Sequence, residues 1–131
     1  MDESMKTELD SFLNLFAKSQ SPFEVTLQGF GRFFEKVIFI EVLPNQSLQV
    51  AHSGIADALR QFGIQESPAS RPFRTHVTVA HRDLKPAEFR RAWKEFENKV
   101  FEARFEAGGI SLLRHHPGGW EVVGTFSFWN A

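Results

Sequence analysis

The sequence contains no cysteine and no tyrosine among its 131 residues. Without cysteine, the chain has no disulfide framework, no thiolate nucleophile and no zinc site built on thiolates. A chain of this composition suits a reducing compartment, so we expect a cytoplasmic location.

A long apolar run is also missing, and the first residues, Met1-Asp2-Glu3-Ser4, are acidic where an export signal would be basic. We therefore expect neither export nor membrane insertion. An excess of positive charge is missing too, because the formal net charge is −1. An anionic substrate would have to be held by a local cluster of basic groups rather than by the whole protein.

Aromatic side chains, in contrast, are plentiful, with fifteen phenylalanines and three tryptophans. A chain of 131 residues is long enough to bury a core without disulfides or a structural metal. The sequence therefore predicts one domain, spanning residues 1–131, with a core rich in phenylalanine.

Hydrophobic periodicity and turn residues predict nine elements in the order αββαβαβββ. Glycines at positions 29 and 31 interrupt the second element, and Ser47 is the expected N-cap of the second helix, which ends at Gly63. Residues 65–71 are expected to form a loop, and residues 115–119, which include two histidines, a hairpin turn. The expected helices are 7–18, 47–63 and 86–99, and the expected strands are 23–27, 36–43, 73–80, 100–105, 109–114 and 120–128.

This order is typical of an α+β sandwich built from two ferredoxin-like lobes that are intertwined in sequence. No strand-like run precedes the first helix, so we expect the first lobe to lack its N-terminal strand relative to the second. The unpaired sheet edge that results would invite pairing with another strand, which predicts a homodimer across that edge.

The strand expected at 73–80 carries the most informative motif, in which His76 and Thr78 are two residues apart. Because side chains alternate across a strand, both should project from one face into a groove while Val77 and Val79 are buried on the other. An imidazole exchanges protons near neutral pH, and a hydroxyl can donate to an anionic oxygen. This pair therefore indicates one half of a site for phosphoester chemistry.

The residues around the motif extend the pattern. The motif itself is Phe73-Arg74-Thr75-His76-Val77-Thr78-Val79, and it is preceded in the chain by an alternating Pro22–Leu27 run, by Gly29-Phe30-Gly31 and by an apolar run over Val37–Val42. In this order the segments resemble the two-histidine (2H) phosphoesterase superfamily, which includes RNA 2′,5′-ligase-like proteins and 2′,3′-cyclic phosphodiesterases. Family members carry His-x-Thr/Ser on two strands, the second commonly after Phe-Arg-Pro-His, so Thr75 replaces the usual proline.

The resemblance implies a mechanism without metal or other cofactor. One histidine removes a proton from water or a ribose hydroxyl while the other protonates the leaving oxygen, and two hydroxyl residues hold the phosphate. His76 and Thr78 would be one such pair. The candidate substrate-binding residues are Arg74, His81, Arg82 and Phe30. His81 stands where relatives often carry an arginine.

Simpler explanations exist for each candidate. An isolated His-x-Thr is usually an ordinary strand, the charged residues can be solvated, and Phe30 can be part of the core rather than a base-stacking residue. The first His-x-Thr of the family, which belongs on the strand before the first helix, is not in this sequence. Either the chain is a fragment that lost this strand, or it is a natural variant with half of the site.

Three hypotheses therefore remain open. The first is a 2H phosphoesterase or RNA 2′,5′-ligase-like protein that acts on a 2′,3′-cyclic phosphate or a 2′,5′ linkage, with an RNA end or a small cyclic nucleotide as its partner. The second is a catalytically inactive module of the same fold that binds a nucleotide phosphate. The third is a structural partner whose sheet edge is completed by another chain.

Overall fold

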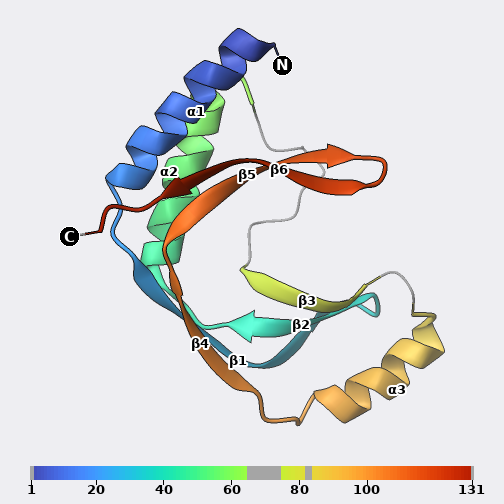
Figure 1. The fold of residues 1–131 in the computed structure, drawn as a ribbon. Coiled ribbons are helices and arrows are strands. Elements are labelled where there is room, and N and C mark those ends of the chain that lie inside the picture. Colours follow the sequence, from blue (N-terminus) through green and yellow to red (C-terminus); the bar gives the residue numbers. More distant parts are fainter. Residues whose placement is uncertain (1, 65–74, 82–83, 131) are drawn as a thin grey trace. The chain divides into compact units, whose positions relative to one another are not determined.

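The computed structural model describes residues 2–64, 75–81 and 84–130 (Figure 1). Over these residues the chain adopts a mixed α+β fold in the expected order of elements, which confirms the predicted class. The expected loop at 65–71 and the first residues of the strand expected at 73–80 lie outside the described residues. The elements are α1 (Glu3–Lys18), β1 (Phe23–Phe33), β2 (Val37–Val42), α2 (Gln46–Gln61), β3 (His76–His81), α3 (Pro86–Phe96), β4 (Glu102–Ala107), β5 (Gly109–His116) and β6 (Gly119–Ser127).

The fold divides into two compact units, each assembled from segments that are separated in sequence. The hairpin unit takes its described residues from Met1–Phe23, Asn45–Ser70 and Glu106–Ala131, and the four-strand unit takes them from Glu24–Pro44 and Arg71–Phe105. Within the described residues, the first holds α1, α2 and a sheet of two strands, β5 and β6. The second holds α3 and most of a sheet with the order β3-β2-β1-β4.

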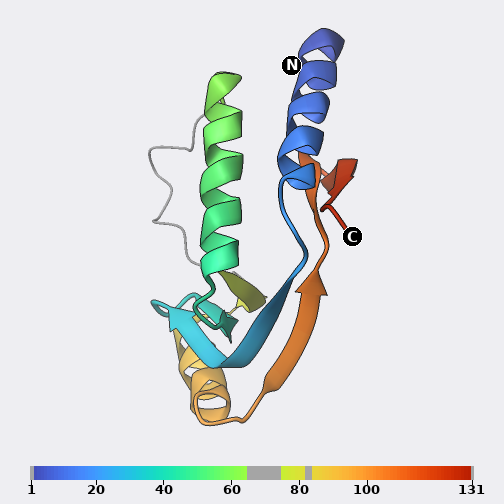
Figure 2. The ribbon, with the colours of Figure 1, turned by 90° about the vertical axis from the view of Figure 1, so that its left-hand side faces the viewer.

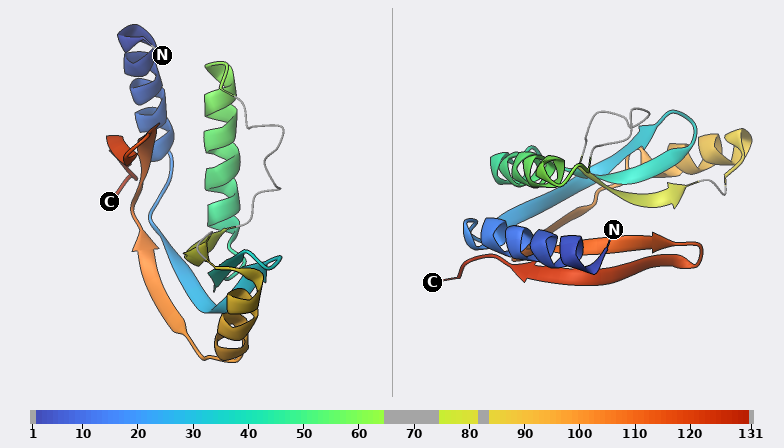
Figure 3. Two further views of the ribbon diagram at one scale, coloured as in Figure 1. Left: turned by 90° about the vertical axis from the view of Figure 1, so that its right-hand side faces the viewer. Right: turned by 90° about the horizontal axis from the view of Figure 1, so that it is seen from above.

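In the hairpin unit, α1 buries one side of the helix. Leu9, Leu13 and Ala17 recur every four residues and pack with Phe126 of β6 and with Phe128 just beyond it. The helices α1 and α2 run antiparallel, side by side (Figure 2), and α1 lies along the β5–β6 hairpin (Figure 3). One face of the hairpin is therefore covered by helix.

Both helices of this unit begin earlier than expected because an acidic or amide side chain caps each of them. The Asp2 carboxylate accepts a hydrogen bond from the Met5 N–H at 2.8 Å, so α1 starts four residues before Thr7. The Asn45 side chain accepts from the Leu48 N–H at 3.1 Å, so the expectation that Ser47 caps α2 was wrong. The helix ends at Gln61, two residues before the expected Gly63, which adopts a positive φ of 76° just past the helix end.

The four-strand unit contains one long strand where the sequence predicted an interruption. Strand β1 continues through Gly29 and Gly31 and pairs antiparallel with β2 on both sides of them. The register shifts between Leu27 and Phe30, and Gly29 there has a φ of 74°, which glycine adopts without strain. Its N–H donates to the Phe101 carbonyl at 2.9 Å, so the bulge keeps its hydrogen bonding.

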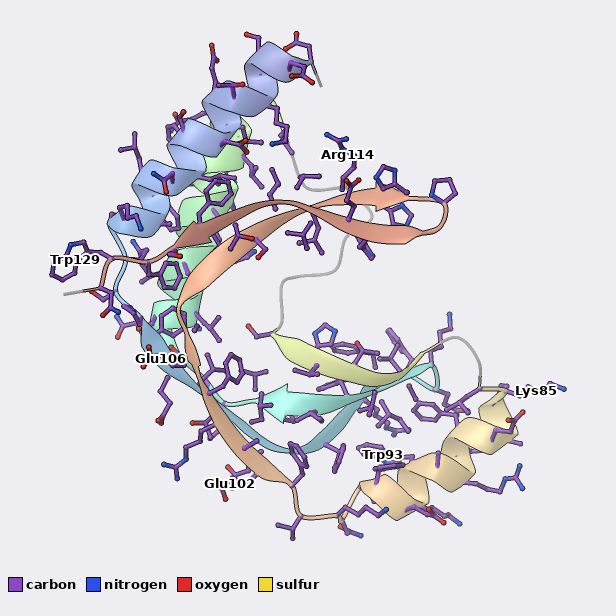
Figure 4. The ribbon with its side chains drawn as sticks, in the orientation of Figure 1. Lys85, Trp93, Glu102, Glu106, Arg114 and Trp129 are labelled. Carbon is purple, nitrogen blue, oxygen red and sulfur yellow. The ribbon has the colours of Figure 1, made fainter. Side chains whose placement is uncertain are left out.

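Helix α3 covers one face of this sheet. Phe89 is fully buried, and the Phe96 ring contacts Phe30 at 5.1 Å between centroids. Trp93 (Figure 4) lies under the Arg32 guanidinium, which is 5.6 Å from the ring centroid. The expected inward face of this helix is confirmed, but the helix ends at Phe96 rather than Lys99. The next strand also begins later than expected, at Glu102, and continues to Ala107.

The two histidines expected in a turn lie in strands instead. The turn of the hairpin consists of Pro117 and Gly118. On either side of this turn, His115 pairs with Trp120 and His116 pairs with Gly119. The tight turn lengthens both strands, because the residues flanking it complete the ladder of backbone hydrogen bonds. The His116 Nε2 atom lies 2.6 Å from a Glu121 carboxylate oxygen on the neighbouring strand.

Candidate functional site

The candidate site lies on the face of the four-strand sheet that is opposite α3. Strand β3 pairs antiparallel with β2, which places His76 opposite Glu41 and Thr78 opposite Phe39. Residues opposite one another in adjacent strands share a face, so these four residues project from the same side of the sheet. The expectation that His76 and Thr78 lie on one face of a strand is confirmed.

An irregularity further along β3 brings a third position onto this face. The register shifts between the pairs Ile38–Ala80 and Phe39–Thr78, so one extra residue stands in β3. As a result His81 pairs with Val37, and position 81 falls on the same face as His76 and Thr78. In a regular strand, position 81 would fall on the opposite face. The bulge thus gathers both histidine positions of the strand on one side.

Aromatic rings support the imidazole of His76. The centroid of its ring lies 4.9 Å from that of Phe33 and 5.3 Å from that of Phe39, both in edge-on contacts. Phe39 is fully buried, whereas His76 is exposed. The imidazole therefore rests on the core at one side and faces solvent at the other. Packing of this kind limits the rotamers of the imidazole.

Glu41 completes this face because the neighbouring strand has no side chain at position 31. A Cβ atom on Gly31 would lie 2.5 Å from the Glu41 Oε1 atom and 2.7 Å from the Phe39 ring. The glycine therefore lets both side chains lie flat across β1. A carboxylate consequently stands on the strand position next to His76.

The residues that alternate with the motif are not buried, contrary to expectation. Val77 is 43% exposed and Val79 is 52% exposed. Among the described strands, β3 lies at the edge of the sheet, where little covers it, and the bulge removes Val79 from the regular alternation. The strand periodicity predicted the face of His76 and Thr78 but not the environment of the other face.

The remaining candidates are not brought together with His76 by the described residues. Phe30 pairs with Ile40, which pairs with Val77, so Phe30 lies on the opposite face, where its ring contacts those of Phe96 and Phe101. The structure gives Phe30 a packing position under α3. Arg74 and Arg82 lie outside the described residues.

In residues 2–64, 75–81 and 84–130, no group of three or more histidine, cysteine, aspartate or glutamate side chains could hold a metal ion. None of the helices in those ranges is both long and apolar enough to cross a membrane. A shallow depression of about 350 Å³ lies in the hairpin unit, lined in part by Ser19, Gln20 and Ser47, and its lining residues include no ionisable side chain.

Sequence reasoning missed Glu41, Phe33 and Phe39 as neighbours of His76. Each is in a different strand or far from the motif in sequence, so only the register between β1, β2 and β3 could identify them. Gly31 was the available signal, because an isolated glycine within a strand often marks a close approach of other groups.

Comparisons with known proteins agree with this fold. Residues 1–119 match the family model described as the 2′-5′ RNA ligase superfamily. The structure is similar to the crystal structure of TT0787 of Thermus thermophilus, with a TM-score of 0.67 and 19% sequence identity. That similarity covers 98% of this chain and 72% of the other. No curated protein matches the sequence.

Proposed function

The chain belongs to the 2′-5′ RNA ligase superfamily, and from this we propose that it acts on, or binds, a 2′,3′-cyclic phosphate or a 2′,5′-linked nucleotide at an RNA end. The observation that supports the proposal is the pair of His76 and Thr78 on one open face of the sheet. Both side chains are exposed beside the buried Phe39 ring and the half-buried Phe33 ring, which is a suitable place for a small anionic ligand to bind.

Each residue has a definite task in this proposal. The Thr78 hydroxyl donates a hydrogen bond to a non-bridging phosphate oxygen, and the His76 imidazole takes a proton from the attacking hydroxyl or gives one to the leaving oxygen. These steps need no metal, because the hydrogen bond from Thr78 and the proton moved by His76 offset the charge that develops on the phosphate oxygens. The same contacts serve cleavage and ligation, since the two directions share a transition state.

An in-line displacement needs an acid and a base on opposite sides of phosphorus, and the sequence holds a single His-x-Thr. We therefore expect the 131-residue chain to turn over a 2′,3′-cyclic nucleotide about 10²- to 10⁴-fold more slowly than a site that has both groups. Binding of the nucleotide should persist, because the Thr78 hydroxyl and the His76 ring N–H donate to the phosphate without a second motif.

A titration and a turnover assay on the same protein test the proposal. We would measure binding of a 2′,3′-cyclic nucleotide calorimetrically and its hydrolysis chromatographically, each with and without a chelator. His76→Ala and Thr78→Val should each weaken binding, whereas Thr78→Ser should retain it because the hydroxyl remains. His116→Ala is the matched control, since it removes another strand histidine, one paired with Glu121 in the hairpin unit.

The outcomes separate the hypotheses. Binding without turnover supports the non-catalytic phosphate-binding module, and fast turnover in the chelator means that a second acid or base exists, with His52, His81, His115 or a second copy of the chain as its source. Binding that is equal in the wild type, His76→Ala and Thr78→Val contradicts the proposed site. A homodimer through an unpaired sheet edge remains a prediction, which light scattering over a range of concentrations would test.

A further inference from the structure

The β5–β6 hairpin presents one face that is neither buried nor charged. The residues on this face alternate with Ile110, Leu112 and Phe126, which face the core of the hairpin unit. The residues of the open face are all exposed, and they form three cross-strand pairs. The open hairpin face consists of Ser111 opposite Thr125, Leu113 opposite Val122, and His115 opposite Trp120.

This composition is unusual for a solvated sheet surface. The outward face of an antiparallel sheet normally carries charged and polar side chains. Here Trp120 is 67% exposed, and the aliphatic pair Leu113 and Val122 lies next to it. Exposed apolar groups that lie together on a surface mark a place where a ligand binds.

Two rings at the end of this face are already arranged for stacking. The centroids of the His115 and Trp120 rings lie 4.6 Å apart, with their planes inclined by 58°. The indole is held against a neighbour on one side and remains largely open to solvent. A large, exposed aromatic ring offers a face on which a flat ligand can stack.

The geometry points to the open hairpin face as a stacking platform for an unpaired nucleobase of single-stranded RNA, with Trp120 as the main contact. This inference rests on the proposed function and names the subsite that would hold a base. Unpaired bases are recognised by stacking on aromatic side chains and by hydrogen bonds to their edges. The indole and the apolar pair supply the stacking surface, and the Ser111 and Thr125 hydroxyls can donate to or accept from a base or a ribose.

The size and charge of the face favour this ligand over a second protein chain. A stable protein interface uses about 20–30 residues on each side, whereas this face has six. It carries no carboxylate, and the Glu121 carboxylate in the same strand is engaged with His116. Arg114 (Figure 4) lies opposite Glu121 on the other face of the hairpin, so the open hairpin face offers a base an uncharged stacking surface.

Binding of a single-stranded RNA octanucleotide to the 131-residue chain tests the platform. Trp120→Ala should weaken binding by about 5- to 150-fold, the range measured for loss of one base–aromatic contact. Trp120→Phe should retain most of the affinity because a ring remains. Trp129→Ala is the matched control, since it removes another exposed tryptophan of the same unit, located after β6 (Figure 4).

Fluorescence and salt dependence separate stacking from other effects. In a Trp93→Phe, Trp129→Phe variant, the signal of Trp120 should be quenched on addition of RNA. The loss caused by Trp120→Ala should be similar at low and high salt, because base stacking is not electrostatic. The platform is refuted if Trp120→Ala binds RNA like the wild type.

The remaining outcomes are equally decisive. If the mass of the wild type rises with concentration and that of Trp120→Ala does not, the face binds a second copy of the chain, and the RNA platform is rejected. A loss of RNA binding in Trp120→Ala that leaves cyclic-nucleotide binding intact supports the platform. If His76→Ala changes the affinity for neither the cyclic nucleotide nor the RNA, while Trp120→Ala weakens RNA binding, the phosphate site is contradicted and the platform is supported.

Discussion

The hairpin unit and the four-strand unit each have a sheet with one face covered by helix, but they use the other face differently. In the four-strand unit, the open face includes the fully buried Phe39, because His76 and Phe33 lie against its ring. In the hairpin unit, every residue of the open face is exposed, and His115 contacts a tryptophan that is itself in solvent.

The difference shows how the same residue type acquires different roles. His76 is part of the packing of its unit, so the fold restricts where its nitrogens point. His115 contacts the exposed ring of Trp120, which suits a surface that adapts to a flat ligand. Proton transfer needs fixed geometry, whereas base stacking tolerates variation.

The strongest way to test the comparison is to remove a core ring from each unit. Phe39→Ala and Phe126→Ala should each lower the free energy of unfolding by about 3–5 kcal/mol, because each leaves a cavity. Trp93 reports on the four-strand unit and Trp129 on the hairpin unit, so urea unfolding would be followed with each tryptophan in turn. If Phe39→Ala shifts both signals equally, the two units unfold as one structure.

A smaller effect should follow from filling the space at position 31. Gly31→Ala places a methyl group against the Phe39 ring and the Glu41 carboxylate, so we expect a loss of about 1–3 kcal/mol from overpacking. Gly118→Ala is a suitable control, because nothing lies within 4 Å of a Cβ there. Thermal unfolding measures both variants. Equal midpoints for the two would show that the side chains around Gly31 can move aside.

The cap of α2 distinguishes the structure from the sequence-based expectation. Asn45→Ala should cost about 1 kcal/mol, because the Leu48 N–H loses its acceptor. Ser47→Ala should cost less than about 0.5 kcal/mol, since residue 47 lies inside the helix. Chemical unfolding of both proteins decides the matter. A larger loss for Ser47→Ala would restore Ser47 as the cap.

The smallest effect should come from an ion pair at the surface of the four-strand unit. The Arg90 guanidinium lies 2.7 Å from a Glu35 carboxylate oxygen, and both side chains are about half exposed. Glu35→Gln should therefore lower stability by about 0.2–1 kcal/mol, and salt should reduce the difference. Unfolding at low and high ionic strength would show this. A loss that is unchanged by salt would mean that packing, rather than charge, holds the two residues together.

Much of the architecture was readable in the sequence. Local periodicity determined the order and type of the nine elements in the described residues, because apolar spacing distinguishes helices from strands over short distances. The errors in the prediction lay at the ends of the elements, where a single cap or turn determines the boundary. The Asp2 and Asn45 caps and the two-residue turn at Pro117 and Gly118 each moved a boundary.

The candidate site, too, was predictable in part from local spacing and in part only from the tertiary structure. The spacing of His76 and Thr78 was sufficient to place them on one face, since side chains alternate along any strand. Register and bulges depend on contacts between segments far apart in sequence. Only the tertiary structure could therefore place Glu41 beside His76, gather position 81 on the same face and turn Phe30 away from it.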